Sequence, residues 1–115
     1  MFWNRKPSGE AAEVKDMTAS QVFQGLQQDS IVLVDVREPQ EHMAERIEGS
    51  LLNPLSRFDP AALPVGTKEV VLYCAIGRRS RAAIERCRDA GVPVTAHLAG
   101  GLQSWKSARL PIATG

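Results

Sequence analysis

The sequence is poor in cysteine, in net charge and in long apolar runs, and each shortage argues against a class of protein. Two cysteines among 115 residues cannot build a disulfide framework. A formal net charge of +1 is far from the basic balance of a general nucleic-acid binder. No apolar run reaches the length of a membrane span or of a signal-peptide core. We therefore expect a cytoplasmic protein with reduced thiols that binds neither nucleic acid nor a membrane.

The residues that are present fit one compact domain. A chain of 115 residues, 43% hydrophobic and 23% charged, has an ordinary globular composition and is too short for two domains. Its beginning contains Pro7, Ser8 and Gly9 and has no clear strand pattern. The sequence therefore predicts a flexible tail over residues 1–15 and a single domain over residues 16–113.

Two continuous runs of apolar, largely β-branched residues, 31–36 and 69–73, predict strands that are buried on both faces. Further short strands are expected over residues 51–55 and 92–98, and helices over residues 18–26, 38–44, 80–90 and 102–108. Strands that alternate with helices favour an α/β fold, in which a small parallel sheet has helices on both faces. Ligands bind such folds at the carboxyl ends of the strands, which is where Cys74 lies.

The loop that follows residues 69–73 carries the strongest chemical signal. It reads Cys74, Ala75, Ile76, Gly77, Arg78, Arg79, Ser80. Successive backbone N–H groups, the N-terminus of the next helix and the arginines all favour an anion, and therefore the ionised thiolate of Cys74. We predict that Cys74 is the catalytic nucleophile and that the six residues after it bind the substrate. Ser80 is expected both to cap the helix and to donate a hydrogen bond to the sulfur.

Four segments, taken in order, resemble the signatures of the rhodanese-like domain family. They are residues 34–39 with Glu41, residues 47–55, residues 71–80, and residues 98–102 with Trp105. The resemblance extends from about residue 17 to residue 111. It implies a rhodanese-like fold and a sulfurtransferase that moves sulfane sulfur from thiosulfate, or another small anionic donor, through a Cys74 persulfide. The acceptor would be cyanide, a thiol or a protein thiol, and neither a metal nor an organic cofactor would be needed.

The length of the loop bears on two alternative functions. Phosphatases related to the rhodanese family separate cysteine from arginine by five residues, which would require arginine at the position of Ser80. Arg79 closes a loop one residue shorter, so a phosphatase or arsenate reductase is disfavoured. Some rhodanese-like domains without the cysteine act as partner-binding modules, and this alternative stays open although Cys74 is present. The sequence does not define the donor, the acceptor or the oligomeric state.

Three charged residues outside the loop are expected to support it. Asp35 lies near the end of the strand predicted over residues 31–36, and Arg37 and Glu41 follow it. Carboxylates and arginines at strand ends commonly form ion pairs, so we interpret these three as a structural network rather than as acid–base catalysts.

The remaining candidate residues are assigned roles outside the chemistry. Sulfur transfer by a thiolate requires no histidine base, so His42 is interpreted as a surface residue and His97 as a strand residue. Cys87 shares a predicted helix face with small apolar residues and is expected to be buried and unreactive. Trp105 is expected to pack in the core.

Overall fold

The computed structural model describes residues 13–115. Most of the predicted tail, residues 1–12, lies outside this range. The first strand, β1 (Lys15–Met17), begins inside the segment predicted as tail. No helix among residues 13–115 is long and apolar enough to cross a membrane.

The core of the fold is a parallel sheet of five strands in the order β1-β6-β5-β2-β4. The other four strands are β2 (Ile31–Asp35), β4 (Leu51–Leu52), β5 (Glu69–Tyr73) and β6 (Ala96–Leu98). The two continuous apolar runs form β2 and β5, which lie side by side inside the sheet, so the sequence-based prediction for these strands is confirmed.

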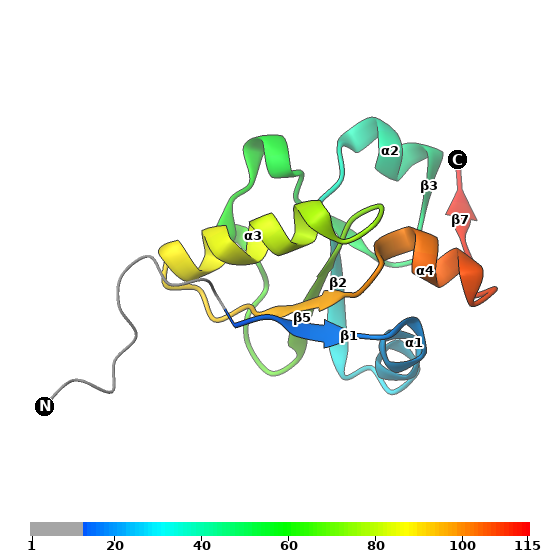
Figure 1. The fold of residues 1–115 in the computed structure, drawn as a ribbon, viewed down its shortest axis with the longest axis horizontal. Helices are drawn as coiled ribbons and strands as arrows, with labels where there is room; N and C mark the ends of the chain where they lie inside the picture. The colour runs from blue at the N-terminus through cyan, green and yellow to red at the C-terminus, as the bar shows by residue number, and fades with distance from the viewer. Residues whose placement is uncertain (1–12) are drawn as a thin grey trace, which may run out of the picture.

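Helices cover both faces of this sheet, as the sequence predicted (Figure 1). The helices are α1 (Ala19–Gln27), α2 (Pro39–Ala44), α3 (Arg78–Asp89) and α4 (Gly101–Ser107), with 3₁₀ turns at Leu55–Arg57 and Pro60–Ala62. Side chains alternate along β5: Val71 and Tyr73 pack with residues of α1 and α4, while Val70 and Leu72 pack with residues of α3. A fully buried side chain such as Ile84 of α3 stabilises this arrangement by roughly 1.5–3 kcal/mol.

A second, two-stranded sheet joins the end of the chain to its middle. Strand β7 (Ala113–Thr114) pairs antiparallel with β3 (Glu45–Arg46), directly after α2. Figure 1 shows β7 running beside β3 near the C-terminus. The sequence analysis did not predict this pair, which holds the end of α2 close to α4.

Candidate active site

Cys74 lies directly after β5, at the carboxyl edge of the sheet, and only 1% of it is exposed. Its Sγ accepts hydrogen bonds from the backbone N–H groups of Gly77, at 3.1 Å, and Ser80, at 3.3 Å. The Ser80 hydroxyl lies 3.6 Å from the same sulfur. Two backbone N–H groups of the loop therefore donate to the sulfur, as the sequence predicted for an anion-binding loop. The predicted hydrogen bond from the Ser80 hydroxyl runs in the opposite direction, because here the Cys74 thiol donates to Ser80 Oγ.

The helix after the loop starts two residues earlier than predicted. Gly77 is its N-cap, with φ of 108°, and α3 begins at Arg78. Glycine reaches this left-handed conformation without a Cβ clash, which lets the chain turn sharply into the helix. The prediction that Ser80 caps the helix is therefore wrong. Ser80 lies within the first turn, where its hydroxyl is fully buried and faces Cys74.

The first turn of α4 supports the loop from behind. The N–H groups of Leu102 and Gln103 donate to the carbonyl oxygens of Cys74, at 2.8 Å, and Ala75, at 3.0 Å. Gly101 makes this approach possible, because a Cβ at that position would lie 2.5 Å from the Cys74 carbonyl oxygen. The sequence analysis did not predict that this glycine supports the loop.

Arg79, which closes the loop, is already paired with a carboxylate. Its two terminal nitrogens donate to Glu41 of α2 at 2.8 and 3.0 Å. This pairing holds the pKa of Glu41 at about 2, below its ordinary value of 4.5. Arg78 is exposed and makes no ion pair within residues 13–115, so it is the free cation at the loop.

Asp35 and Arg37 form a buried ion pair beside the loop. The Arg37 side chain donates to both Asp35 carboxylate oxygens, and its backbone N–H donates to Oδ1 at 2.9 Å. The predicted network is thus present, although Glu41 joins Arg79 rather than Arg37. His42 was interpreted as a surface residue, but its Nδ1 lies 2.9 Å from Asp35 Oδ2 and its side chain is largely buried.

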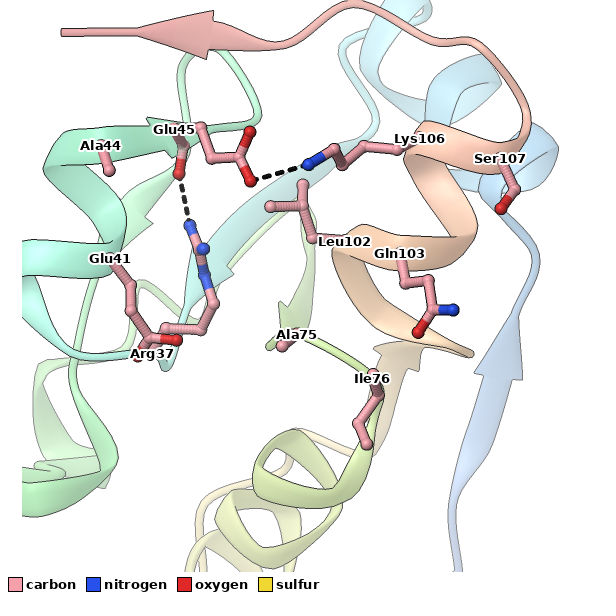
Figure 2. A pocket seen from close by; sticks show the side chains of 10 residues that line it. All are labelled: Arg37, Glu41, Ala44, Glu45, Ala75, Ile76, Leu102, Gln103, Lys106 and Ser107. Carbon is pink, nitrogen blue, oxygen red and sulfur yellow. Dashed lines mark hydrogen bonds and ion pairs between the residues drawn. The ribbon is translucent and has the colours of Figure 1, made fainter.

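An open pocket of about 630 Å³ lies between the loop, the end of α2 and α4 (Figure 2). On the α2 side of the pocket Arg37 donates to the Glu45 carbonyl at 2.7 Å, and Lys106 of α4 forms an ion pair with the Glu45 carboxylate at 2.8 Å. Ala75 and the exposed Ile76 line the pocket on the loop side. Cys74 is buried and is not among the lining residues, so the pocket reaches the loop rather than the sulfur.

His97 is the site residue that the sequence analysis missed. It was interpreted only as a strand residue of the sheet, and it does lie in β6, almost fully buried. Its Nδ1 lies 2.6 Å from the Ser80 hydroxyl, and its Nε2 lies 2.8 Å from the Asp16 carboxylate. Asp16 precedes His97 by 81 residues, and no local pattern in the sequence links them.

The other two core residues behave as predicted. Cys87 is buried on the sheet-facing side of α3, and burial raises the pKa of its thiol to about 11, so it stays protonated at neutral pH. Trp105 packs in the core and donates its indole N–H to the Pro111 carbonyl at 2.8 Å. Within residues 13–115, no three His, Cys, Asp or Glu side chains are grouped so that they could hold a metal ion.

Comparison with known proteins identifies the family. The family model described as the rhodanese-like domain matches residues 18–108. The uncharacterized protein slr1261 of Synechocystis sp. is 49% identical over 86 residues, 74% of this chain and 48% of that protein. The thiosulfate:glutathione sulfurtransferase of Saccharomyces cerevisiae is 32% identical over 97 residues, 72% of this chain and 70% of that protein. A solved rhodanese-related structure from Thermoplasma volcanium has a TM-score of 0.75 at 26% identity, covering 88% of this chain and 99% of that one.

The chain therefore belongs to the rhodanese-like domain family, as its four sequence segments indicated. Sulfurtransferases are among its relatives. The chain spans about half the length of the Synechocystis relative.

Proposed function

We propose that the protein is a sulfurtransferase that carries sulfane sulfur as a persulfide on Cys74. The observation that carries this proposal is the contact of Cys74 Sγ with the Gly77 and Ser80 amides, 3.1 and 3.3 Å away. Amides that surround a sulfur in this way stabilise a negative charge on it, whether the sulfur belongs to a thiolate or to a bound persulfide. The relationship to a yeast sulfurtransferase that acts on thiosulfate supports the same reaction.

The reaction needs no redox partner when thiosulfate is the donor. The Cys74 thiolate attacks the outer sulfur of thiosulfate, a new S–S bond forms, and the bond to the sulfonate sulfur breaks to release sulfite. The acceptor's thiolate or cyanide then attacks the terminal persulfide sulfur, and the Cys74 thiolate leaves. Arg78, exposed at the first turn of α3, is placed to attract the dianionic donor.

The test is the mass of the protein after incubation with thiosulfate and removal of the excess. We expect a gain of one sulfur atom, assigned to the Cys74 peptide. Cys74→Ser abolishes the gain, and Cys87→Ala, the matched loss of the other thiol, retains it. A wild-type chain that gains no sulfur from thiosulfate, a thiosulfonate or a polysulfide would overturn the proposal.

The same preparation separates the two alternative functions. Hydrolysis of an aryl phosphate that depends on Cys74 would indicate a phosphatase, against the short loop closed by Arg79. A chain that gains no sulfur and binds a partner equally well as wild type and as Cys74→Ser would indicate a binding module. Either result would replace the sulfur-transfer proposal.

A further inference from the structure

The side chains of Ser80, His97 and Asp16 connect Cys74 to the protein surface through successive contacts. The Ser80 hydroxyl lies 3.6 Å from Cys74 Sγ and 2.6 Å from His97 Nδ1. His97 Nε2 lies 2.8 Å from Oδ1 of Asp16, whose side chain is 55% exposed. Cys74, Ser80 and His97 are each at most 2% exposed. The three buried side chains are therefore connected by successive contacts to the exposed carboxylate of Asp16.

The sheet register creates this alignment. Asp16 in β1 and His97 in β6 are paired residues of neighbouring parallel strands, so their side chains project from the same face of the sheet. Ala96 and Leu98 pack in the core beneath α1 and α4. Because side chains alternate along a strand, His97 points to the opposite face, where α3 presents Ser80.

The chemistry of the donors and acceptors fixes the direction of the hydrogen bonds. An ionised carboxylate can only accept, so His97 Nε2 carries the proton that faces Asp16. In the neutral imidazole Nδ1 is then an acceptor and takes the hydrogen bond of the Ser80 hydroxyl. The Ser80 hydroxyl also lies 3.2 Å from the Gly77 carbonyl oxygen, but its 2.6 Å contact with His97 Nδ1 is the shorter of the two. With its one proton directed to His97, the Ser80 oxygen can accept from the Cys74 thiol.

We infer that His97 accepts the thiol proton of Cys74 through the Ser80 hydroxyl, and that Asp16 orients and stabilises the resulting imidazolium. The Cys74 S–H bond breaks and its electron pair stays on sulfur. The thiol proton passes to Ser80 Oγ while the Ser80 proton passes to His97 Nδ1, so an imidazolium and a thiolate are formed. The inference deepens the proposed function, on which it rests for the use made of the thiolate. Cys74 and Ser80 are its catalytic members, and His97 and Asp16 act through Ser80 as positioning residues.

The charged groups around His97 make the relay depend on Asp16. Arg78 and Arg81 of α3 line a pocket of about 280 Å³ together with Asp16 and His97. Both arginines oppose a further positive charge on the imidazole, whereas Asp16 favours it. Asp16 is in direct contact with His97, and it also contacts Arg81 at 3.4 Å. Asp16 therefore offsets the repulsion that the arginines would impose on the protonated ring.

The test is the rate at which iodoacetamide alkylates Cys74, measured from about pH 5 to pH 9.5 by mass spectrometry of the Cys74 peptide. In His97→Asn an amide can still contact Ser80 but does not titrate. We expect the midpoint of its rate–pH curve to rise by about one unit, so that alkylation below the midpoint is about ten-fold slower, with the alkaline plateau unchanged. Ser80→Ala should give the same shift, and the double variant should give no further shift because both changes break one relay.

A surface variant keeps the test valid if a buried variant fails to fold. Asp16→Asn should raise the midpoint by a smaller amount, because the hydrogen bond can remain while the negative charge is lost. Asp29→Asn is the matched control, since Asp29 is also exposed and ion-paired, with Lys68, and lies far from the loop in sequence. An unchanged midpoint in both Asp16→Asn and His97→Asn would overturn the inference. A lower plateau without a midpoint shift would also overturn it, because that is the signature of a merely structural role.

The alkylation experiment tests the relay, and the persulfide experiment tests sulfur transfer, so either proposal can be refuted while the other stands. A wild-type chain that gains no sulfur from any donor, yet has a midpoint that depends on His97, would refute sulfur transfer and support the relay. A chain that forms the Cys74 persulfide with an alkylation curve insensitive to His97 would refute the relay and support sulfur transfer.

Discussion

Arg79 and Glu41 hold each other through two hydrogen bonds, of 2.8 and 3.0 Å, that connect the Cys74 loop to α2. The arginine that closes the loop is thus fixed in place and largely neutralised before any anionic substrate arrives. It defines the shape of the loop, and the free positive charge is left to Arg78. A role for Arg79 in binding the substrate, which the sequence predicted, would require it to share its charge with Glu41.

Glu41→Gln should lower stability in a pH-dependent way. The pKa of Glu41 is about 2 in the folded chain and 4.5 ordinarily, so the pair contributes stability above about pH 4.5 and loses it as the pH falls toward 2. Both side chains are about one-third exposed, which limits the contribution to about 0.2–1 kcal/mol. Urea denaturation should find Glu41→Gln less stable than wild type at pH 7 and equal to it near pH 2. Glu48→Gln, on an exposed turn, serves as the control, and a difference that does not vary with pH would contradict the prediction.

Gly101→Ala should damage the loop without touching its residues. The added Cβ would lie 2.5 Å from the Cys74 carbonyl oxygen, and the φ of +61° is unfavourable for alanine. We expect a loss of roughly 1–3 kcal/mol in the free energy of unfolding, together with slower persulfide formation. Gly66→Ala is the matched control, because nothing lies within 4 Å of its added Cβ. Equal stability of the two variants would show that the close approach of α4 is not needed.

Arg37→Met should destabilise the fold more than any exposed substitution. It leaves the fully buried Asp35 carboxylate without its main partner, which costs about 3–5 kcal/mol. Adding Asp35→Asn should restore part of this loss, because the uncompensated charge is then removed. Urea denaturation measures both effects, with the exposed Arg86→Met as the control. A loss below about 1 kcal/mol in Arg37→Met would show that the pair is not a stabilising element.

Arg78→Ala should weaken the binding of an anionic donor selectively. Losing one exposed charge–charge interaction costs about 1 kcal/mol, which corresponds to a roughly five-fold higher KM for thiosulfate. An uncharged or protein-bound donor should be unaffected, and the difference should shrink at high ionic strength. Arg86→Ala removes the same charge from the far turn of α3 and should leave both values of KM unchanged. A KM for thiosulfate that Arg78→Ala does not change would contradict the role given to this arginine.

Local patterns were sufficient to predict the central part of the fold. The β-branched runs at residues 31–36 and 69–73 predicted β2 and β5 because strands buried on both faces need continuous apolar sequence. The position of Cys74 followed from the end of β5. The loop length, with Ser80 after Arg79, was also readable from the sequence alone.

The parts that were missed depend on distant contacts. Strand β1 (Lys15–Met17) lies at the sheet edge and contains two charged residues, so it has no strand pattern of its own. The two-residue strands β3 and β7 are too short for any periodicity. His97 was identified as a strand residue, but its contact with Asp16 depends on strand order and register, which one sequence does not reveal.

Because α4 supports the loop and follows it in the chain, the loop is synthesised before its support. The amides of Leu102 and Gln103 that hold the carbonyls of Cys74 and Ala75 are made almost thirty residues after the thiol itself. Strand β6, which carries His97 between β1 and β5, is likewise translated late. A ribosome-bound chain that has just exposed Cys74 therefore has the nucleophile without the scaffold that shapes it. The loop around the thiol is complete only when α4 has emerged and docked.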